Sequence, residues 1–131
     1  MKKTKSLAKL KADCQLVFNE YIRLRDAGKP CISCGKMIYL QAGHYFPTQG
    51  YDGLRFDEFN VNGECAGCNC FDDAHLIHYG QNLPGRIGAE NYRCLIHEAK
   101  TYKREGYKWR RSELTELIEK YKAKVKELKC Q

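Results

Sequence analysis

The sequence of 131 residues predicts an α+β fold in which helices flank a small core centred on a metal. Two Cys-x-x-Cys pairs, at 31–34 and 65–68, have the spacing of ligands to a tetrahedral ion. The thirty residues between the pairs are enough for a β-hairpin, and apolar residues recur at helical spacing on both sides. Chain length predicts one domain over 1–131, with an N-terminal helix (1–30), a metal-bound core (31–80) and C-terminal helices (86–131).

Helices are expected at residues 7–26, 69–79, 89–104 and 112–129, and apolar periodicity predicts the first of these and the last two. Gly28-Lys29-Pro30 should end the first helix, and Pro84 and Gly85 should end the second. Ser112 is a plausible N-cap for the last helix. The apolar stripe along that last helix could pack inside one chain or join two copies, so a homodimer stays open.

Extended segments are expected inside the core, at residues 37–40, 43–46 and 54–56. The stretch 47–53 is rich in turn-forming residues and should be an exposed loop. The core is therefore expected to be a hairpin closed at both ends by the cysteine pairs.

Composition favours a soluble protein with a nucleic-acid partner and argues against a membrane protein. The formal charge is +7, and lysines concentrate at residues 2–11 and 100–129, which suits a polyanion such as DNA. No apolar run reaches the roughly 18 residues of a membrane span, and the lysine-rich start lacks the apolar stretch of a signal peptide. A cytoplasmic protein is expected.

The cysteine pairs predict a structural zinc site. The thiolates of Cys31, Cys34, Cys65 and Cys68 would fill the coordination shell of Zn²⁺ and leave no position for a substrate. In a reducing compartment this spacing favours metal over disulfides. A redox dithiol is the rival interpretation of one pair, and iron in place of zinc stays open.

Residues between and beside the pairs suggest hydrolytic chemistry. If zinc fixes both ends of the hairpin, His44 on one strand and Asn69 directly after the last cysteine can approach the same point. An imidazole can take a proton from water while a hard cation steadies a phosphate, which is what phosphodiester cleavage requires.

The order of these motifs resembles a known family. Cys-x-x-Cys, Gly-His-Tyr at 43–45, Leu-Arg-Phe-Asp-Glu-x-Asn at 54–60 and Cys-x-x-Cys-Asn at 65–69 look like the HNH nucleases of the ββα-metal fold. They look more closely like the phage NinG/Rap family of recombination endonucleases, and the likeness extends to 18–26 and 86–88. The resemblance implies a zinc-stabilised, treble-clef-like ββα-metal core and a phage or prophage protein acting in a bacterial host cell.

The same resemblance implies roles for individual residues. His44 matches the general base, Asn60 the central asparagine that positions the histidine or its loop, and Asn69 a ligand for Mg²⁺ or Mn²⁺. Arg55 is our choice for holding the scissile phosphate, because a guanidinium can grip two phosphate oxygens. The implied activity is structure-selective cleavage of branched DNA, such as four-way (Holliday) junctions and D-loops.

One departure concerns the acidic metal ligand that many HNH sites carry directly before the histidine. Gly43 stands there, so a carboxylate must come from elsewhere, and Asp57, Glu58 and Asp72 are the candidates. Asp72 lies one helical turn beyond Asn69 and could share its face. If none serves, the alternative function is a noncatalytic zinc-stabilised DNA-binding module. His75 and His78 are interpreted as polar residues of a helix surface.

Overall fold

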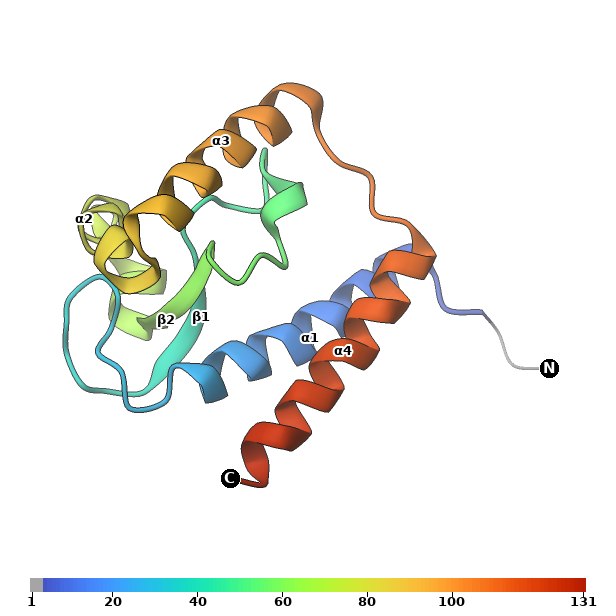
Figure 1. Ribbon diagram of the computed structural model, residues 1–131, viewed down its shortest axis with the longest axis horizontal. Helices are drawn as coiled ribbons and strands as arrows, with labels where there is room; N and C mark the ends of the chain where they lie inside the picture. Colours follow the sequence, from blue (N-terminus) through green and yellow to red (C-terminus); the bar gives the residue numbers. More distant parts are fainter. Residues whose placement is uncertain (1–3) are drawn as a thin grey trace.

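The computed structural model describes residues 4–131 and is a mixture of helices with one small sheet, as expected for an α+β fold (Figure 1). The helices are α1 (Leu7–Arg25), α2 (His75–Ile87), α3 (Ala89–Glu105) and α4 (Arg111–Lys129). The strands are β1 (Leu40–His44) and β2 (Val61–Cys65). Two short turns complete the order, the 3-10 turn η1 (Asp52–Leu54) and the π-helical turn η2 (Gly67–Phe71). No helix of the described residues is long and apolar enough to cross a membrane.

The two strands form an antiparallel hairpin that packs against α1. Leu40 pairs with Cys65 at one end and His44 with Val61 at the other. Successive side chains of a strand point to opposite faces, so Ala42 and His44 share one face while Gln41 and Gly43 share the other. Ala42 packs towards α1, and the hydroxyl of Tyr79 from α2 donates to the carbonyl of Gly43 at 2.7 Å. The hairpin therefore has an α1 side and an α2 side.

The α1 side is filled by packing between α1 and α4, which lie next to each other and run in the same direction (Figure 1). An ion pair joins Lys129 to Glu20 near their C-terminal ends. In the core, the ring of Phe18 makes edge contacts with Tyr121 of α4 and with Phe56. The apolar stripe of α4, formed by Leu114, Tyr121 and Val125, is buried within this one chain.

The α2 side holds a second apolar cluster. Tyr79 and Leu83 of α2 pack with Leu95 and Ala99 of α3, together with Ile32 of the first cysteine turn. Fully burying such side chains contributes about 1.5–3 kcal/mol each. Helices α2 and α3 thus fix the first cysteine pair against the hairpin.

The strand predictions were wrong in position. Residues 37–39 form an exposed loop, and the first strand begins only at Leu40. The returning strand is β2 rather than residues 54–56, which form the end of η1 and the turn after it. Leu54 and Phe56 look like a strand in sequence because they are both buried, but they enter the two different apolar clusters.

The helix predictions were accurate for three helices and wrong for the second. The segment after Cys68 forms η2, and α2 begins at His75 and continues through Pro84 to Ile87. Burial of Leu83 outweighs the weakening effect of Pro84 on the helix. The last helix has its N-cap at Arg110, two residues before the predicted Ser112, and the carboxylate of Glu113 accepts from the backbone amide of Arg110 at 3.0 Å.

Candidate functional site

The four predicted cysteines come together at the open end of the hairpin. The sulfur atoms of Cys31, Cys34, Cys65 and Cys68 all lie within 4.8 Å of one another. The Cys34 and Cys65 sulfurs are 3.8 Å apart. Four thiolates placed tetrahedrally at about 2.3 Å from Zn²⁺ would be roughly 3.8 Å apart. The cluster could therefore hold a structural zinc.

Backbone amides prepare this cluster for an ion. The amides of Cys65 and Cys34 point at the Cys31 sulfur, at 3.3 and 3.5 Å. Burial by itself would raise the pKa of the Cys31 thiol, but these amide donors lower it to about 7. Gly35 adopts a φ of +76°, which lets the chain turn back after Cys34. A thiolate is the form that binds metal, so the amides favour the binding state.

His44 lies at the far end of β1 with one ring nitrogen fixed. Its Nε2 is 3.0 Å from the carbonyl oxygen of Arg55. A carbonyl only accepts, so Nε2 carries the proton and Nδ1 keeps the lone pair. Burial lowers the pKa of His44 below its ordinary value of 6.5. Burial therefore favours the neutral form of the imidazole, with Nδ1 as its basic atom.

Asn60 is fully buried and holds the loop between the strands. Its Oδ1 accepts from the amide of Phe46 at 2.8 Å, and its Nδ2 donates to the carbonyls of Phe46 and Leu54, both at 3.1 Å. These bonds join the beginning and the end of the loop that carries Arg55. Asn60 therefore fixes the segment whose carbonyl holds His44, which is the geometry that a positioning role requires.

The guanidinium of Arg55 is engaged within the chain. Its Nε donates to Asp52 at 2.7 Å and its Nη1 to Gln15 at 3.2 Å. The backbone carbonyl of Arg55, rather than its side chain, contacts His44. Phosphate binding by Arg55 stays a prediction, and it would require the guanidinium to share or leave these partners.

Asn69 lies in η2 with its amide group oriented by a neighbour on β1. Its Nδ2 donates to Gln41 Oε1 at 2.9 Å. Its Oδ1 faces Gly43 and lies 3.4 Å from the point that a Cβ at Gly43 would occupy. The amide oxygen that could bind a hard cation thus faces the residue directly before His44.

The three acids considered from sequence are engaged elsewhere. Asp57 accepts from the amide of Asn60 at 3.1 Å, and burial raises the pKa of Asp57. Glu58 accepts from the hydroxyls of Tyr21 and Tyr121, both at 2.9 Å. Glu58 therefore joins the loop to α1 and α4.

Asp72 stabilises the start of α2. It is exposed, and its Oδ1 accepts from the amide of Ala74 at 2.9 Å. It does not lie one turn along a helix from Asn69, because η2 ends at Phe71 and α2 starts at His75. The helical-spacing argument for Asp72 therefore fails, and a role for Asp72 as a ligand stays a prediction.

Glu64 is the acid that the structure places beside Asn69 and Gly43. It is 0% exposed on β2, opposite Gln41. Its Oε2 contacts Nδ1 of His75 at 2.7 Å and the hydroxyl of Ser33, whereas Oε1 has no hydrogen-bond partner within residues 4–131. Sequence reasoning missed Glu64 because it placed the returning strand at 54–56. The alternating apolar and polar residues of 61–65 were the available signal.

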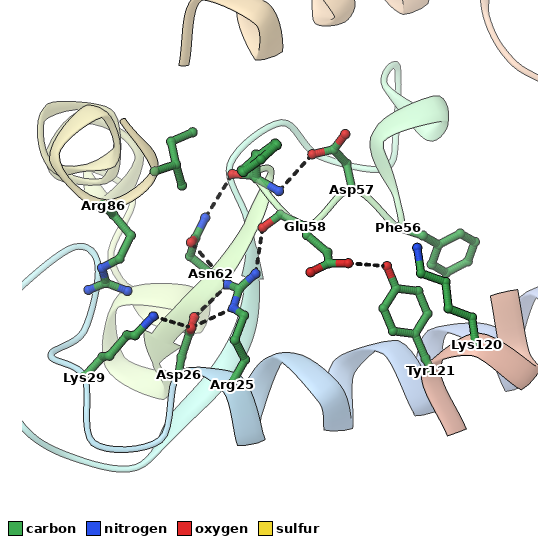
Figure 2. A pocket seen from close by; sticks show the side chains of 12 residues that line it. Arg25, Asp26, Lys29, Phe56, Asp57, Glu58, Asn62, Arg86, Lys120 and Tyr121 are labelled. Atoms are coloured by element: carbon green, nitrogen blue, oxygen red, sulfur yellow. Dashed lines mark hydrogen bonds and ion pairs between the residues drawn. The ribbon is translucent and has the colours of Figure 1, made fainter. Parts of the chain in front are cut away.

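A surface cleft of about 570 Å³ lies along the outer edge of β2 (Figure 2). Its charged lining consists of Arg25, Asp26, Lys29, Asp57, Glu58, Arg86 and Lys120. Arg25 and Lys29 both pair with Asp26, which in turn accepts from the amide of Gly63 at 2.7 Å. Figure 2 shows these side chains pointing towards one another. The charged side chains of this cleft largely pair with one another, and the cleft contains neither His44 nor the cysteine cluster.

Fold and site define a small α+β protein with a four-cysteine cluster that could bind zinc, next to a hairpin that carries a histidine and two asparagines. The family model described as "NinG: Bacteriophage Lambda NinG protein" matches residues 1–131, and the chain belongs to this family.

Curated relatives agree with this assignment. Protein ninG of Escherichia phage 933W is 36% identical over 117 residues, which are 88% of this chain and 56% of the relative. Protein ninG of Salmonella phage P22 is 36% identical over 118 residues (88% and 55%), and that of Escherichia phage lambda is 34% identical over 117 (88% and 55%). The chain thus spans about half the length of the curated relatives it matches. No solved structure matches it.

Proposed function

We propose that this NinG-family protein is a metal-dependent, structure-selective DNA endonuclease that cleaves branched recombination intermediates such as four-way junctions and D-loops. The observation that carries the proposal is the state of His44. Its Nε2–H is held by a backbone carbonyl, its Nδ1 is basic, and its pKa is lowered by burial. A neutral imidazole with one fixed nitrogen has the properties of a general base.

In the proposed reaction, Nδ1 of His44 takes a proton from a water molecule as that water attacks the scissile phosphorus. The Arg55 carbonyl stabilises the imidazolium that forms, because it accepts from the Nε2–H on the opposite side of the ring. Asn60 keeps this carbonyl in place through its three bonds to the loop. The P–O3′ bond breaks, the leaving 3′ oxygen takes a proton from a second water molecule, and the products would carry 5′-phosphate and 3′-hydroxyl ends.

The proposed divalent ion would bind beside Gly43, the residue directly before this base. Asn69 Oδ1 is a hard ligand, and it faces the space beside Gly43 that Glu64 Oε1 also borders; this Glu64 oxygen has no hydrogen-bond partner among the described residues. When bound, Mg²⁺ or Mn²⁺ would stabilise negative charge on the phosphate and on the leaving 3′ oxygen.

The DNA backbone would be bound by basic side chains of α3 and α4. Exposed cations on these helices include Lys100, Lys103, Arg104, Lys120, Lys122 and Lys126. By contrast, α1 uses Lys9 in a pair with Asp13 and Lys11 in a pair with Asp52. Contacts of this kind read backbone rather than bases, so selectivity would depend on DNA shape and binding would weaken with salt.

The rival function is a noncatalytic zinc-stabilised DNA-binding module with the same basic surface. Cleavage of four-way, D-loop and linear DNA by the zinc-loaded protein, with Mg²⁺, with Mn²⁺ and without either, separates the two. We expect ion-dependent cleavage of the branched substrates and its loss in His44→Ala, with junction binding retained. His78→Ala is the matched control, because His78 is an exposed histidine of α2.

Two results would refute the nuclease. If the unmodified protein bound junctions but cut none with either ion, the binding module would be the correct function. If His44→Ala cleaved as well as His78→Ala, the proposed base would be wrong.

A further inference from the structure

We propose that Glu64 supplies the carboxylate of the divalent-ion site, taking the place of the acid that is absent at position 43. This inference rests on the proposed function for the purpose of the ion, but it is argued from the packing of the hairpin. It assigns to β2 a ligand that the related motif places on β1.

The first argument is the burial of a carboxylate with one unused oxygen. Glu64 is 0% exposed, and its Oε1 has no partner among the described residues. Burying a charged group without compensation is costly, so buried carboxylates are paired, hydrogen-bonded or bound to a metal. A cation at Oε1 would satisfy the free oxygen.

The second argument is the fit between Gly43 and Glu64 across the hairpin. A Cβ placed on Gly43 would lie 2.6 Å from Glu64 Oε1 and 2.9 Å from Glu64 Cβ. Both distances are too short, so any side chain at 43 would displace Glu64. An acid at 43 therefore requires Glu64 to move, so side chains at the two positions compete for the same space.

The third argument is that Asn69 approaches the same place. Its Oδ1 and Glu64 Oε1 lie 3.4 and 2.6 Å from that one point, so the two oxygens are at most about 6 Å apart. Two oxygens bound to one Mg²⁺ at about 2.1 Å can be separated by up to roughly 4.2 Å. The two candidate ligands, on β2 and on η2, therefore face one point, and side-chain rotation that brings their oxygens within about 4.2 Å would let them share an ion.

His75 and Ser33 act as positioning residues in this arrangement. Both contact Oε2 of Glu64, His75 from the first turn of α2 and Ser33 from the first cysteine turn. Their contacts occupy one carboxylate oxygen and leave the other directed towards Gly43. Ligands of metals are commonly oriented by such neighbours.

The test is Mn²⁺ affinity of the zinc-loaded protein, measured by electron paramagnetic resonance in the absence of DNA. Glu64→Gln keeps the shape of the side chain and removes its charge. We expect it to weaken Mn²⁺ binding by about 100-fold or more. Replacing a residue that only orients a metal ligand typically weakens metal binding by about 10- to 100-fold, so a direct ligand should show a loss at or beyond the upper end of that range. Asp72→Asn is the matched comparison and should bind as the unmodified protein does. Loss of binding in Asp72→Asn with none in Glu64→Gln would overturn the assignment.

Moving the carboxylate across the hairpin provides a second variant. Gly43→Asp/Glu64→Gly should bind Mn²⁺ more tightly than Glu64→Gly alone. Glycine is used at 64 because alanine would keep the Cβ that lies 2.9 Å from the new side chain. Equal affinity of the double and single variants would contradict the exchange of positions.

The unmodified protein provides a readout that does not depend on any variant folding. Substoichiometric Mn²⁺ should broaden the amide resonances of Gly43 and Glu64 most strongly. Strongest broadening at Asp57 or Glu58 would overturn the proposal. If Mn²⁺ binds at Glu64 but no DNA is cut, the nuclease fails and the ion site stands. If DNA is cut and Glu64→Gln changes neither Mn²⁺ binding nor cleavage, the nuclease stands and the proposed ion site fails.

Discussion

Replacing Asn60 should both destabilise the fold and loosen the general base. In Asn60→Ala the amide of Phe46 and the carbonyls of Phe46 and Leu54 lose their bonds inside the protein. A typical intramolecular hydrogen bond contributes about 1 kcal/mol net, and a buried group left unpaired costs about 1–3 kcal/mol. The three bonds therefore predict a loss of at least about 3 kcal/mol in the free energy of unfolding.

The substitution Asn60→Asp should be worse than alanine. Its carboxylate can still accept from the Phe46 amide, but it would face the two carbonyls to which Nδ2 now donates. A buried charge beside two acceptors is strongly unfavourable. Asn82→Ala is the control, since Asn82 also donates to backbone carbonyls, of Ile32 and Ser33, but is exposed. Asn82→Ala should lower the free energy of unfolding by less than about 1 kcal/mol.

The assay is urea unfolding of the zinc-loaded variants, followed by far-ultraviolet circular dichroism. A loss of about 3 kcal/mol would lower the thermal midpoint by roughly 10 °C in a domain of this size. Junction cleavage by Asn60→Ala, measured below its unfolding midpoint, should also fall because the Arg55 carbonyl is no longer fixed against His44. If Asn60→Ala lost no more stability than Asn82→Ala, the reasoning about the loop would be wrong.

Two further predictions concern the zinc cluster and pH. Chelation of the metal, or Cys65→Ser, should unfold the centre of the chain, because binding of a structural zinc supplies folding free energy on the order of 10 kcal/mol. Zinc content and circular dichroism measure the loss of metal and the unfolding. An unchanged circular dichroism spectrum after removal of the metal would contradict the prediction. Burial lowers the pKa of His44 below 6.5, so the acidic limb of the cleavage profile should lie below pH 6.5. Unfolded His44 takes up its proton at a higher pH than folded His44, so its contribution to the free energy of unfolding is present above pH 6.5 and is lost as pH falls through the folded pKa. Comparing the pH dependence of unfolding of the unmodified protein and of His44→Ala measures this contribution. An acidic limb of the cleavage profile above pH 6.5 would refute the lowered pKa.

Much of the fold follows from local pattern. The helical periodicity of 7–26, 89–104 and 112–129 corresponds to α1, α3 and α4 within one or two residues. The failures lie where burial, rather than pattern, decides. Leu54 and Phe56 alternate like a strand only because each fills a different apolar cluster. Pro84 stays within α2 because Leu83 beside it is buried.

By itself, the sequence determined the four cysteines, the family and the choice of His44, Asn60 and Asn69 for inspection, because these depend on residue type and spacing. Only the tertiary structure decided which nitrogen of His44 is basic, since the Arg55 carbonyl reaches it across a turn. The register of β1 against β2 likewise decided that Glu64 lies beside Gly43. Register depends on contacts between residues distant in the chain, and a shift by one residue would turn Glu64 to the opposite face.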